Sequence, residues 1–110
     1  MPPFSVEKEA RGTAVRLVLT GDLDLATAGE AELAILTAEE SSPPLLILDL
    51  SELDFMDSTG LRVVVSAASR ARDEDRRLAI VKGPEVVQRV FEITRLAERL
   101  DMVDSVDDVD

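Results

Sequence analysis

The chain has 110 residues, of which 45% are hydrophobic, so residues 1–110 are expected to fold as a single domain that buries its own core. It contains no cysteine and no histidine, which excludes disulfides, thiol nucleophiles, imidazole acid–base chemistry and histidine metal ligands. The net charge of −11 disfavours nucleic acid and anionic membranes as partners and favours a protein partner.

No membrane-spanning or exported segment is expected. The apolar stretches are far shorter than the roughly 20 residues that cross a bilayer, and residues 1–4 lack the basic and apolar regions of a signal peptide. No Gly-rich run ends in Gly-Lys-Ser or Gly-Lys-Thr, so a Walker-type nucleotide site is excluded. We therefore expect a cytoplasmic protein without a cofactor.

The N-terminal part of the chain predicts a β-hairpin followed by a helix. Segments 4–10 and 13–20 flank a turn at 11–12, and the second segment alternates in polarity as a strand with one buried face does. After a turn at 21–24, helical spacing of apolar residues predicts a helix that runs to about Glu40. The residues expected to face the core are Val15, Leu17 and Leu19 of the second strand and Ala28, Ala31, Ile35 and Ala38 of the helix.

Two sets of residues are candidates for capping this first helix. Thr27 stands three residues before Glu30, which is the spacing of a capping box. Asp22 and Asp24 lie in the preceding turn, where a carboxylate can cap the helix and shape the loop. We interpret both aspartates as structural residues, with any contact to a partner as a secondary role.

The middle of the chain predicts a strand–helix–strand unit. The Ser-Ser-Pro-Pro run at 41–44 ends the first helix, and the unalternating apolar run at 45–50 indicates a central strand covered on at least one face. A second helix follows, and the charged turn 72–76 separates it from another apolar strand at 78–81. The predicted inward stripe of this helix consists of Leu61, Val64, Val65 and Ala68.

The opposite side of this second helix holds one apolar residue, Val63. Single exposed apolar residues are common, so Val63 either tucks under a neighbouring loop or belongs to a docking patch. The other residues predicted to face outward are Arg62, Ser66, Ser69 and Arg70.

The C-terminal part predicts a third helix and a short last strand. Pro84 opens the helix, because a proline at a helix start has no N–H to lose. Residues 102–106 are a candidate edge strand, and residues 107–110 are expected to form a solvated, mobile end. The residues of the third helix expected to face inward are Val87, Val90 and Phe91 or Thr94.

This order of elements predicts an α/β fold. An N-terminal hairpin followed by βα units gives a mixed sheet of four or five strands, and right-handed crossovers place the helices mainly on one face. The other face is then expected to be partly open or thinly covered.

The most informative segment is the strand-to-helix turn at 54–61, Asp-Phe-Met-Asp-Ser-Thr-Gly-Leu. Free N–H groups and the positive dipole end of the helix would favour a phosphate on a hydroxyl there, either Ser58 or Thr59. The alternative is that Asp57 or Ser58 only caps the helix.

This turn, with Gly21-Asp22-Leu23-Asp24 after the hairpin and the helix at Pro84, resembles the STAS domain of bacterial anti-sigma-factor antagonists over nearly the full chain. The resemblance implies that Ser58 is phosphorylated by a partner that is both an anti-sigma factor and a serine kinase. The unphosphorylated form would bind this partner and release the sigma factor, and a serine phosphatase would restore it. Thr59 is the second candidate acceptor. The expected partner-binding residues are Asp24, Asp57, Ser58, Thr59, Arg62, Val63 and Ser66.

The chain departs from this family pattern at Arg95, where family members often carry glycine. Either the third helix continues through Leu96 to Leu100, or Arg95 adopts a strained left-handed cap.

Other functions remain open on the sequence alone. STAS domains also serve as scaffold or accessory subunits of stress-sensing and transport complexes, although a chain with its own Met1 and no membrane segment disfavours a transporter appendage.

A response-regulator receiver would use Asp49 or Asp54 as phospho-acceptor with Lys82, but it needs five βα units. An enzyme with Ser58 as nucleophile would need a lysine or carboxylate as base, and we do not expect an enzyme. The two lysines are Lys8 and Lys82.

Overall fold

The computed structural model describes residues 3–109. Five strands, three α-helices and two 3₁₀ turns follow one another along this part of the chain. In chain order they are β1 (Ser5–Arg11), β2 (Ala14–Leu23), α1 (Ala28–Glu39), β3 (Leu45–Met56), α2 (Ser58–Asp73), β4 (Arg77–Val81), α3 (Glu85–Thr94), η1 (Leu96–Arg99), β5 (Met102–Val103) and η2 (Val106–Asp108).

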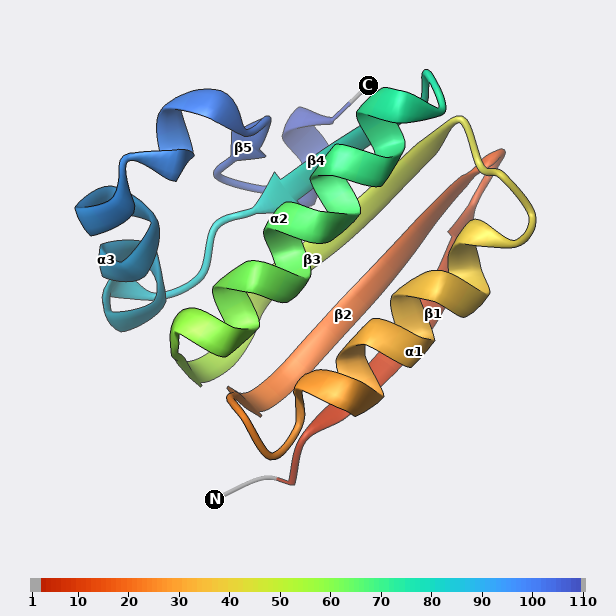
Figure 1. Ribbon diagram of the computed structural model, residues 1–110. Helices are drawn as coiled ribbons and strands as arrows, with labels where there is room; N and C mark the ends of the chain where they lie inside the picture. The colour runs from red at the N-terminus through yellow and green to blue at the C-terminus, as the bar shows by residue number, and fades with distance from the viewer. Residues whose placement is uncertain (1–2, 110) are drawn as a thin grey trace.

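The strands form one mixed sheet in the order β1-β2-β3-β4-β5. The hairpin pair β1–β2 is antiparallel, and the three pairs that follow are parallel. Figure 1 shows α1 and α2 side by side over one face of this sheet, with α3 beyond α2 on the β4 side. The predicted α/β architecture with helices mainly on one face is confirmed.

The core lies between the sheet and the helices. The predicted alternation of β2 is confirmed, because Val15, Leu17 and Leu19 are buried in this core. All four residues predicted to face inward from α1 are buried as well, and so are Val87 and Phe91 of α3. Thr94 is exposed, which leaves Phe91 as the inward residue at the end of α3.

The strand β3 carries an unalternating apolar run because both of its faces are covered. Leu46 and Leu48 belong to the core under the helices, whereas Ile47 and Asp49 are buried on the opposite face. Asp49 is only 1% exposed. Its carboxylate accepts hydrogen bonds from the guanidinium of Arg16 at 2.6 and 3.1 Å and from Ser51 at 2.6 and 2.9 Å.

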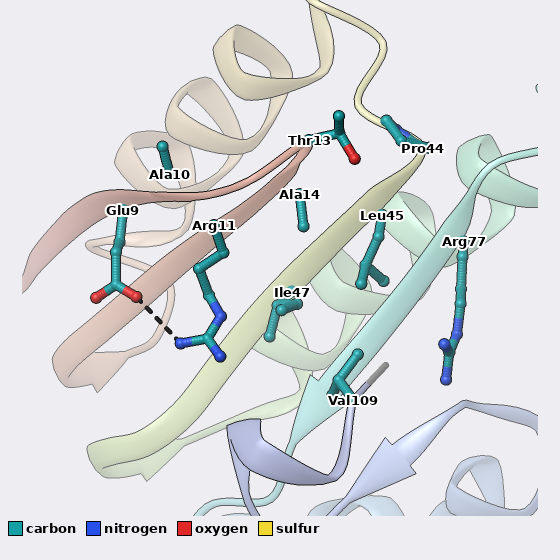
Figure 2. A pocket seen from close by; sticks show the side chains of 10 residues that line it. All are labelled: Glu9, Ala10, Arg11, Thr13, Ala14, Pro44, Leu45, Ile47, Arg77 and Val109. Atoms are coloured by element: carbon teal, nitrogen blue, oxygen red, sulfur yellow. Dashed lines mark hydrogen bonds and ion pairs between the residues drawn. The ribbon is translucent and has the colours of Figure 1, made fainter.

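The last described residues partly cover this opposite face. Figure 2 views a cavity of about 870 Å³ there, in which Val109 lies beside Ile47 while Arg11 and Arg77 stand to either side. The prediction of a thinly covered second face is therefore confirmed. Of the end predicted to be solvated and mobile, residues 107 and 108 belong to η2 and are exposed, and Val109 lines this cavity. Asp110 lies outside the described residues, and the mobility of this end stays a prediction.

Two strands extend further than the sequence predicts. β3 continues to Met56 rather than ending near Leu50, and β2 continues to Leu23. The pairing between them shifts register twice, and Gly21 beside the second shift has a φ of +95°, which glycine adopts without strain. The expected turns at 21–24 and 54–61 are therefore partly strand.

The chain leaves α3 through a left-handed residue. Arg95 has φ 61° and ψ 15°, so the second of the two predicted alternatives is correct and the helix ends at Thr94. The 3₁₀ turn η1 and the short strand β5 follow, and β5 occupies the first two positions of the predicted 102–106 strand.

Candidate functional site

Ser58 is the first residue of α2, directly after the N-cap residue Asp57. The Asp57 carboxylate accepts hydrogen bonds from the backbone N–H groups of Thr59 at 2.9 Å and Gly60 at 3.1 Å. Capping is therefore done by Asp57, which was one of the predicted possibilities. Within residues 3–109 the hydroxyl of Ser58 makes no hydrogen bond, and the residue is exposed, so this hydroxyl is free to react.

Gly60 fixes the start of α2 against the ends of two strands. A Cβ atom on Gly60 would lie 2.7 Å from the carbonyl oxygen of Leu23 and 2.8 Å from the side chains of Leu23 and Met56. The same Leu23 oxygen accepts a hydrogen bond from the Asp57 N–H at 3.2 Å. The position of Ser58 therefore depends on close backbone contact that only glycine permits.

The turn between β2 and α1 is held by Asp24 rather than by a capping box. The Asp24 carboxylate accepts from the N–H groups of Ala26 at 3.0 Å and Thr27 at 3.2 Å, which confirms its predicted role in shaping this loop. The capping box is wrong: the Thr27 hydroxyl donates to the Asp22 carbonyl at 2.7 Å and accepts from the Asp24 N–H at 3.0 Å. Asp22 thus contributes its backbone oxygen to the loop.

Parallel pairing brings the two turns to the same edge of the sheet. Asp22 pairs with Phe55 and Leu23 pairs with Met56 at the ends of β2 and β3. The loop that follows β2 and the start of α2 consequently lie at one end of the molecule, as Figure 1 shows.

Two exposed apolar side chains, which the sequence reading missed, belong to this edge. Leu25 in the β2–α1 loop is 78% exposed and Phe55 near the end of β3 is 43% exposed. A large apolar residue inside a polar turn is the signal that marks them in the sequence. Together with Ser58 they define what we call the Ser58 edge: Leu25, Phe55 and Ser58.

The outward face of α2 is polar rather than apolar. The prediction that Val63 faces outward is wrong, because this side chain is 5% exposed and belongs to the core. α2 packs against α1 and α3 as well as the sheet, so its buried face is wider than one stripe. Arg62 is exposed and Ser66 half-buried, whereas Val65 and Ala68 of the predicted stripe are only half-buried.

The charge around Ser58 is mainly negative. Asp57 precedes it directly, Asp54 is exposed near the end of β3, and Asp24 lies in the neighbouring loop. Arg62, one helical turn further along α2, is the nearest cation in sequence. A phosphate at Ser58 would therefore add charge to an edge that is already acidic.

The residues of the receiver alternative are not assembled into a site. Asp49 is buried and bonded to Arg16 and Ser51, and Lys82 pairs with Asp104 at 3.2 Å. Over residues 3–109 there is no group of three or more acidic side chains placed to hold a metal ion. In the same part of the chain, no helix has the length and apolarity needed to cross a membrane.

Comparison with known proteins identifies the family. The STAS domain family matches residues 5–109. This chain belongs to the STAS domain family. The anti-sigma-B factor antagonist of Listeria monocytogenes is 30% identical over 100 residues, which cover 90% of this chain and 88% of the relative.

Solved structures show the same fold. An anti-sigma factor antagonist from Mycobacterium paratuberculosis aligns with a TM-score of 0.90 at 24% identity, covering 96% of this STAS domain and 90% of that chain. The Bacillus cell fate determinant SpoIIAA in its phosphorylated form aligns with a TM-score of 0.71 at 23% identity, covering 94% and 92%. The resemblance predicted from the turn residues is thus confirmed at the level of family and fold.

Proposed function

We propose that this STAS domain is an anti-sigma factor antagonist that is switched by phosphorylation of Ser58. In its unphosphorylated form it binds an anti-sigma factor with serine kinase activity and releases the sigma factor. The observation that carries the proposal is the exposed, unbonded hydroxyl of Ser58 beside a cap made by Asp57. The curated relative from Listeria is itself named an antagonist of this kind, and SpoIIAA has a phosphorylated form.

The hydrogen bonds at the start of α2 favour a switch that acts on binding. The N–H groups of Thr59 and Gly60 donate to the Asp57 carboxylate, and that of Leu61 donates to the Asp57 carbonyl at 3.0 Å. These N–H groups are the donors that usually hold an anion at a helix start. Because Asp57 already occupies them, a phosphate on Ser58 stays exposed to water and to a partner.

The energetics of phosphorylation agree with this arrangement. A phosphate adds about −1.5 to −2 charges at pH 7, and the helix dipole stabilises such a charge by only about 0.3–1 kcal/mol at an exposed site. The fold should therefore tolerate the modification. Burying the same charge under a partner without a matching cation costs several kcal/mol, and each 1.4 kcal/mol weakens binding about tenfold.

The Ser58 edge supplies the contact surface. A partner that covers Leu25 and Phe55 gains apolar burial at roughly 25 cal/mol per Å², and Ser58 lies at the same end of the sheet, where such a partner would be close to it. Arg62 and the turn of Asp24 border this surface, whereas Val63 is buried and takes no part. Thr59 is half-buried, which makes Ser58 the better acceptor.

The proposal is tested by phosphorylating the protein with ATP and candidate anti-sigma serine kinases from its host, followed by intact-mass measurement and peptide mapping. We expect one phosphate, on Ser58, absent from Ser58→Ala and retained in Thr59→Ala. A serine phosphatase should remove it. We expect both the phosphorylation and its reversal to take place in the cytoplasm.

Ser69→Ala is the matched control, because Ser69 is also an exposed serine of α2 but lies three turns further along the helix. Phosphate on Ser69, or none with any kinase that binds the protein, would contradict the switch. Stable assembly into a large complex without phosphorylation would instead support a scaffold subunit.

A further inference from the structure

Four arginines line one cavity at the end of the sheet opposite to Ser58, although the chain carries a net charge of −11. The cavity has a volume of about 300 Å³. Its arginines come from the end of α2, the turn that leads into β4, the first residue of β4 and the end of η1. We call it the arginine cavity, after Arg72, Arg76, Arg77 and Arg99.

Arg76 is the buried member of this group. Its side chain is 6% exposed, and its Nε donates a hydrogen bond to the Glu74 carboxylate at 3.1 Å. Its Nη2 is ion-paired with the same Glu74 oxygen at 3.0 Å but makes no hydrogen bond of good geometry, and within residues 3–109 its Nη1 has no partner of either kind. A buried N–H group without an acceptor lowers the stability of the folded protein. The Arg76 guanidinium therefore has room for a further acceptor oxygen, which a bound anion would supply.

The carbonyl end of α2 does not satisfy Arg76. The carbonyl oxygens of Arg70, Ala71 and Arg72 already accept from the backbone N–H groups of residues 74, 76 and 75. Asp75, with φ 57°, turns the chain back so that Arg76 lies beneath the helix end. The negative end of the helix dipole alone would repel an anion, so the arginines must outweigh it.

The other charges of the cavity leave guanidinium groups free. Arg77 pairs with Asp101 at 2.8 Å, and both are about half exposed. Arg72 and Arg99 are exposed, and neither forms an ion pair with a carboxylate of residues 3–109. Asp75 is the remaining acid of the lining, so positive charge is in excess here.

We propose that the arginine cavity binds a phosphate-type oxyanion, either free phosphate or the phosphate group of a small molecule. Guanidinium groups bind such oxygens in pairs through their planar forks. The cavity is at the small end of the usual range for ligand sites, and its apolar wall of Ala68, Ala71, Leu78 and Leu100 strengthens charge interactions. The anion first contacts the exposed side chains of Arg72 and Arg99. It reaches the buried Arg76 when the side chains of Arg72 and Arg99 change rotamer.

This site is separate from the phosphorylation switch. Ser58 and Asp73 mark the two ends of α2, which are about 22 Å apart at 1.5 Å per residue. The arginine cavity can therefore bind phosphate whether or not Ser58 is the acceptor.

The test is calorimetric titration of the full chain with inorganic phosphate, with chloride added to hold the ionic strength constant. We expect saturable binding, weakened about tenfold or more in Arg72→Gln and in Arg99→Gln, whose exposed positions leave the fold intact. Arg76→Lys keeps the charge but loses the fork, and it should bind more weakly too. Glycerol phosphate in place of phosphate separates the two sources: tighter binding indicates a phosphorylated small molecule.

Arg89→Gln is the matched control, because Arg89 is an exposed arginine of α3 outside the cavity and its loss changes the net charge equally. Its affinity for phosphate should equal that of the wild type. Phosphate also stabilises proteins non-specifically, so a rise in melting temperature that is equal in all variants, without saturable binding, would overturn the proposal. Unchanged binding by Arg72→Gln and Arg99→Gln would overturn it as well.

Discussion

The two ends of α2 differ in which polar groups have hydrogen-bond partners. At the N-terminal end, Asp57 occupies the N–H groups of Thr59 and Gly60 and leaves the Ser58 hydroxyl outside the network. At the C-terminal end the carbonyl groups have backbone partners, whereas the buried guanidinium of Arg76 is short of acceptors. A negative group at the N-terminal end finds few free N–H donors and stays exposed to solvent. A negative group at the C-terminal end lies near guanidinium N–H groups that have room for another acceptor.

The largest expected effect tests what fixes the N-terminal end. Gly60→Ala should lower the free energy of unfolding by about 3 kcal/mol, because its Cβ would lie under 3 Å from the backbone of Leu23. Gly29→Ala is the control, since nothing lies within 4 Å of a Cβ there, and it should stabilise the protein by up to about 1 kcal/mol. Urea denaturation measures both; equal effects would show that the close packing of α2 is not required.

The next effect shows what complete pairing of a buried carboxylate contributes, for comparison with Arg76. Burial alone would raise the pKa of Asp49, but hydrogen bonds from Ser51 and Arg16 outweigh it and leave that pKa below its ordinary value. Asp49→Asn should therefore destabilise the protein by about 2 kcal/mol at pH 7.

The pH dependence of this effect follows from the lowered pKa of Asp49. Its contribution is complete above the unfolded value of about 3.9 and is lost as the pH falls through the folded value. Unfolding curves of wild type and Asp49→Asn should thus converge in acid. Exposed Asp54→Asn is the control and should change stability by less than about 0.5 kcal/mol. A gap between wild type and Asp49→Asn that persists in acid would contradict the assignment.

A smaller effect tests the claim that Asp57 occupies the donors beside Ser58. Asp57→Ala should cost about 1 kcal/mol and free the N–H groups of Thr59 and Gly60. In that background Ser58→Asp should recover up to about 1 kcal/mol, whereas in the wild type it should change stability by less than about 0.5 kcal/mol. An identical effect of Ser58→Asp in both backgrounds, measured by a double-mutant cycle in urea, would show that the donors are not shared.

The smallest effect concerns the C-terminal end. Arg76→Met in phosphate-free buffer should change the free energy of unfolding by less than about 1 kcal/mol, since it removes an ion pair with the half-exposed Glu74 together with a buried Nη1 that has no acceptor within residues 3–109. A loss of more than about 2 kcal/mol would mean that the whole Arg76 guanidinium is paired in solution, and the C-terminal end of α2 would then have no donor short of an acceptor.

The parts of this fold that follow from local patterns were predictable. The buried residues of α1 recur at helical spacing, and β2 alternates in polarity, so each could be read without knowledge of its neighbours. The start of α3 at Pro84 and the cap at Asp57 are equally local. The turn residues around Ser58 carried the family resemblance.

The parts that depend on several segments were not predictable. Val63 is buried because α2 packs against two other helices, which one helical stripe does not reveal. The end of β3 was missed because Glu52 and Asp54 look like loop residues, although β2 pairs alongside. The arginine cavity requires left-handed turns at Asp75 and Arg95 to bring its segments together.

The most direct test of the switch is the affinity of the anti-sigma partner for four forms of the protein: wild type, Ser58→Ala, Ser58→Asp and Ser69→Asp. We predict that Ser58→Ala and Ser69→Asp bind within a few-fold of the wild type, and that Ser58→Asp binds about a hundredfold more weakly, which corresponds to about 2.8 kcal/mol. Equal affinity of Ser58→Asp and wild type, with full binding retained by the Ser58-phosphorylated protein, would contradict the account.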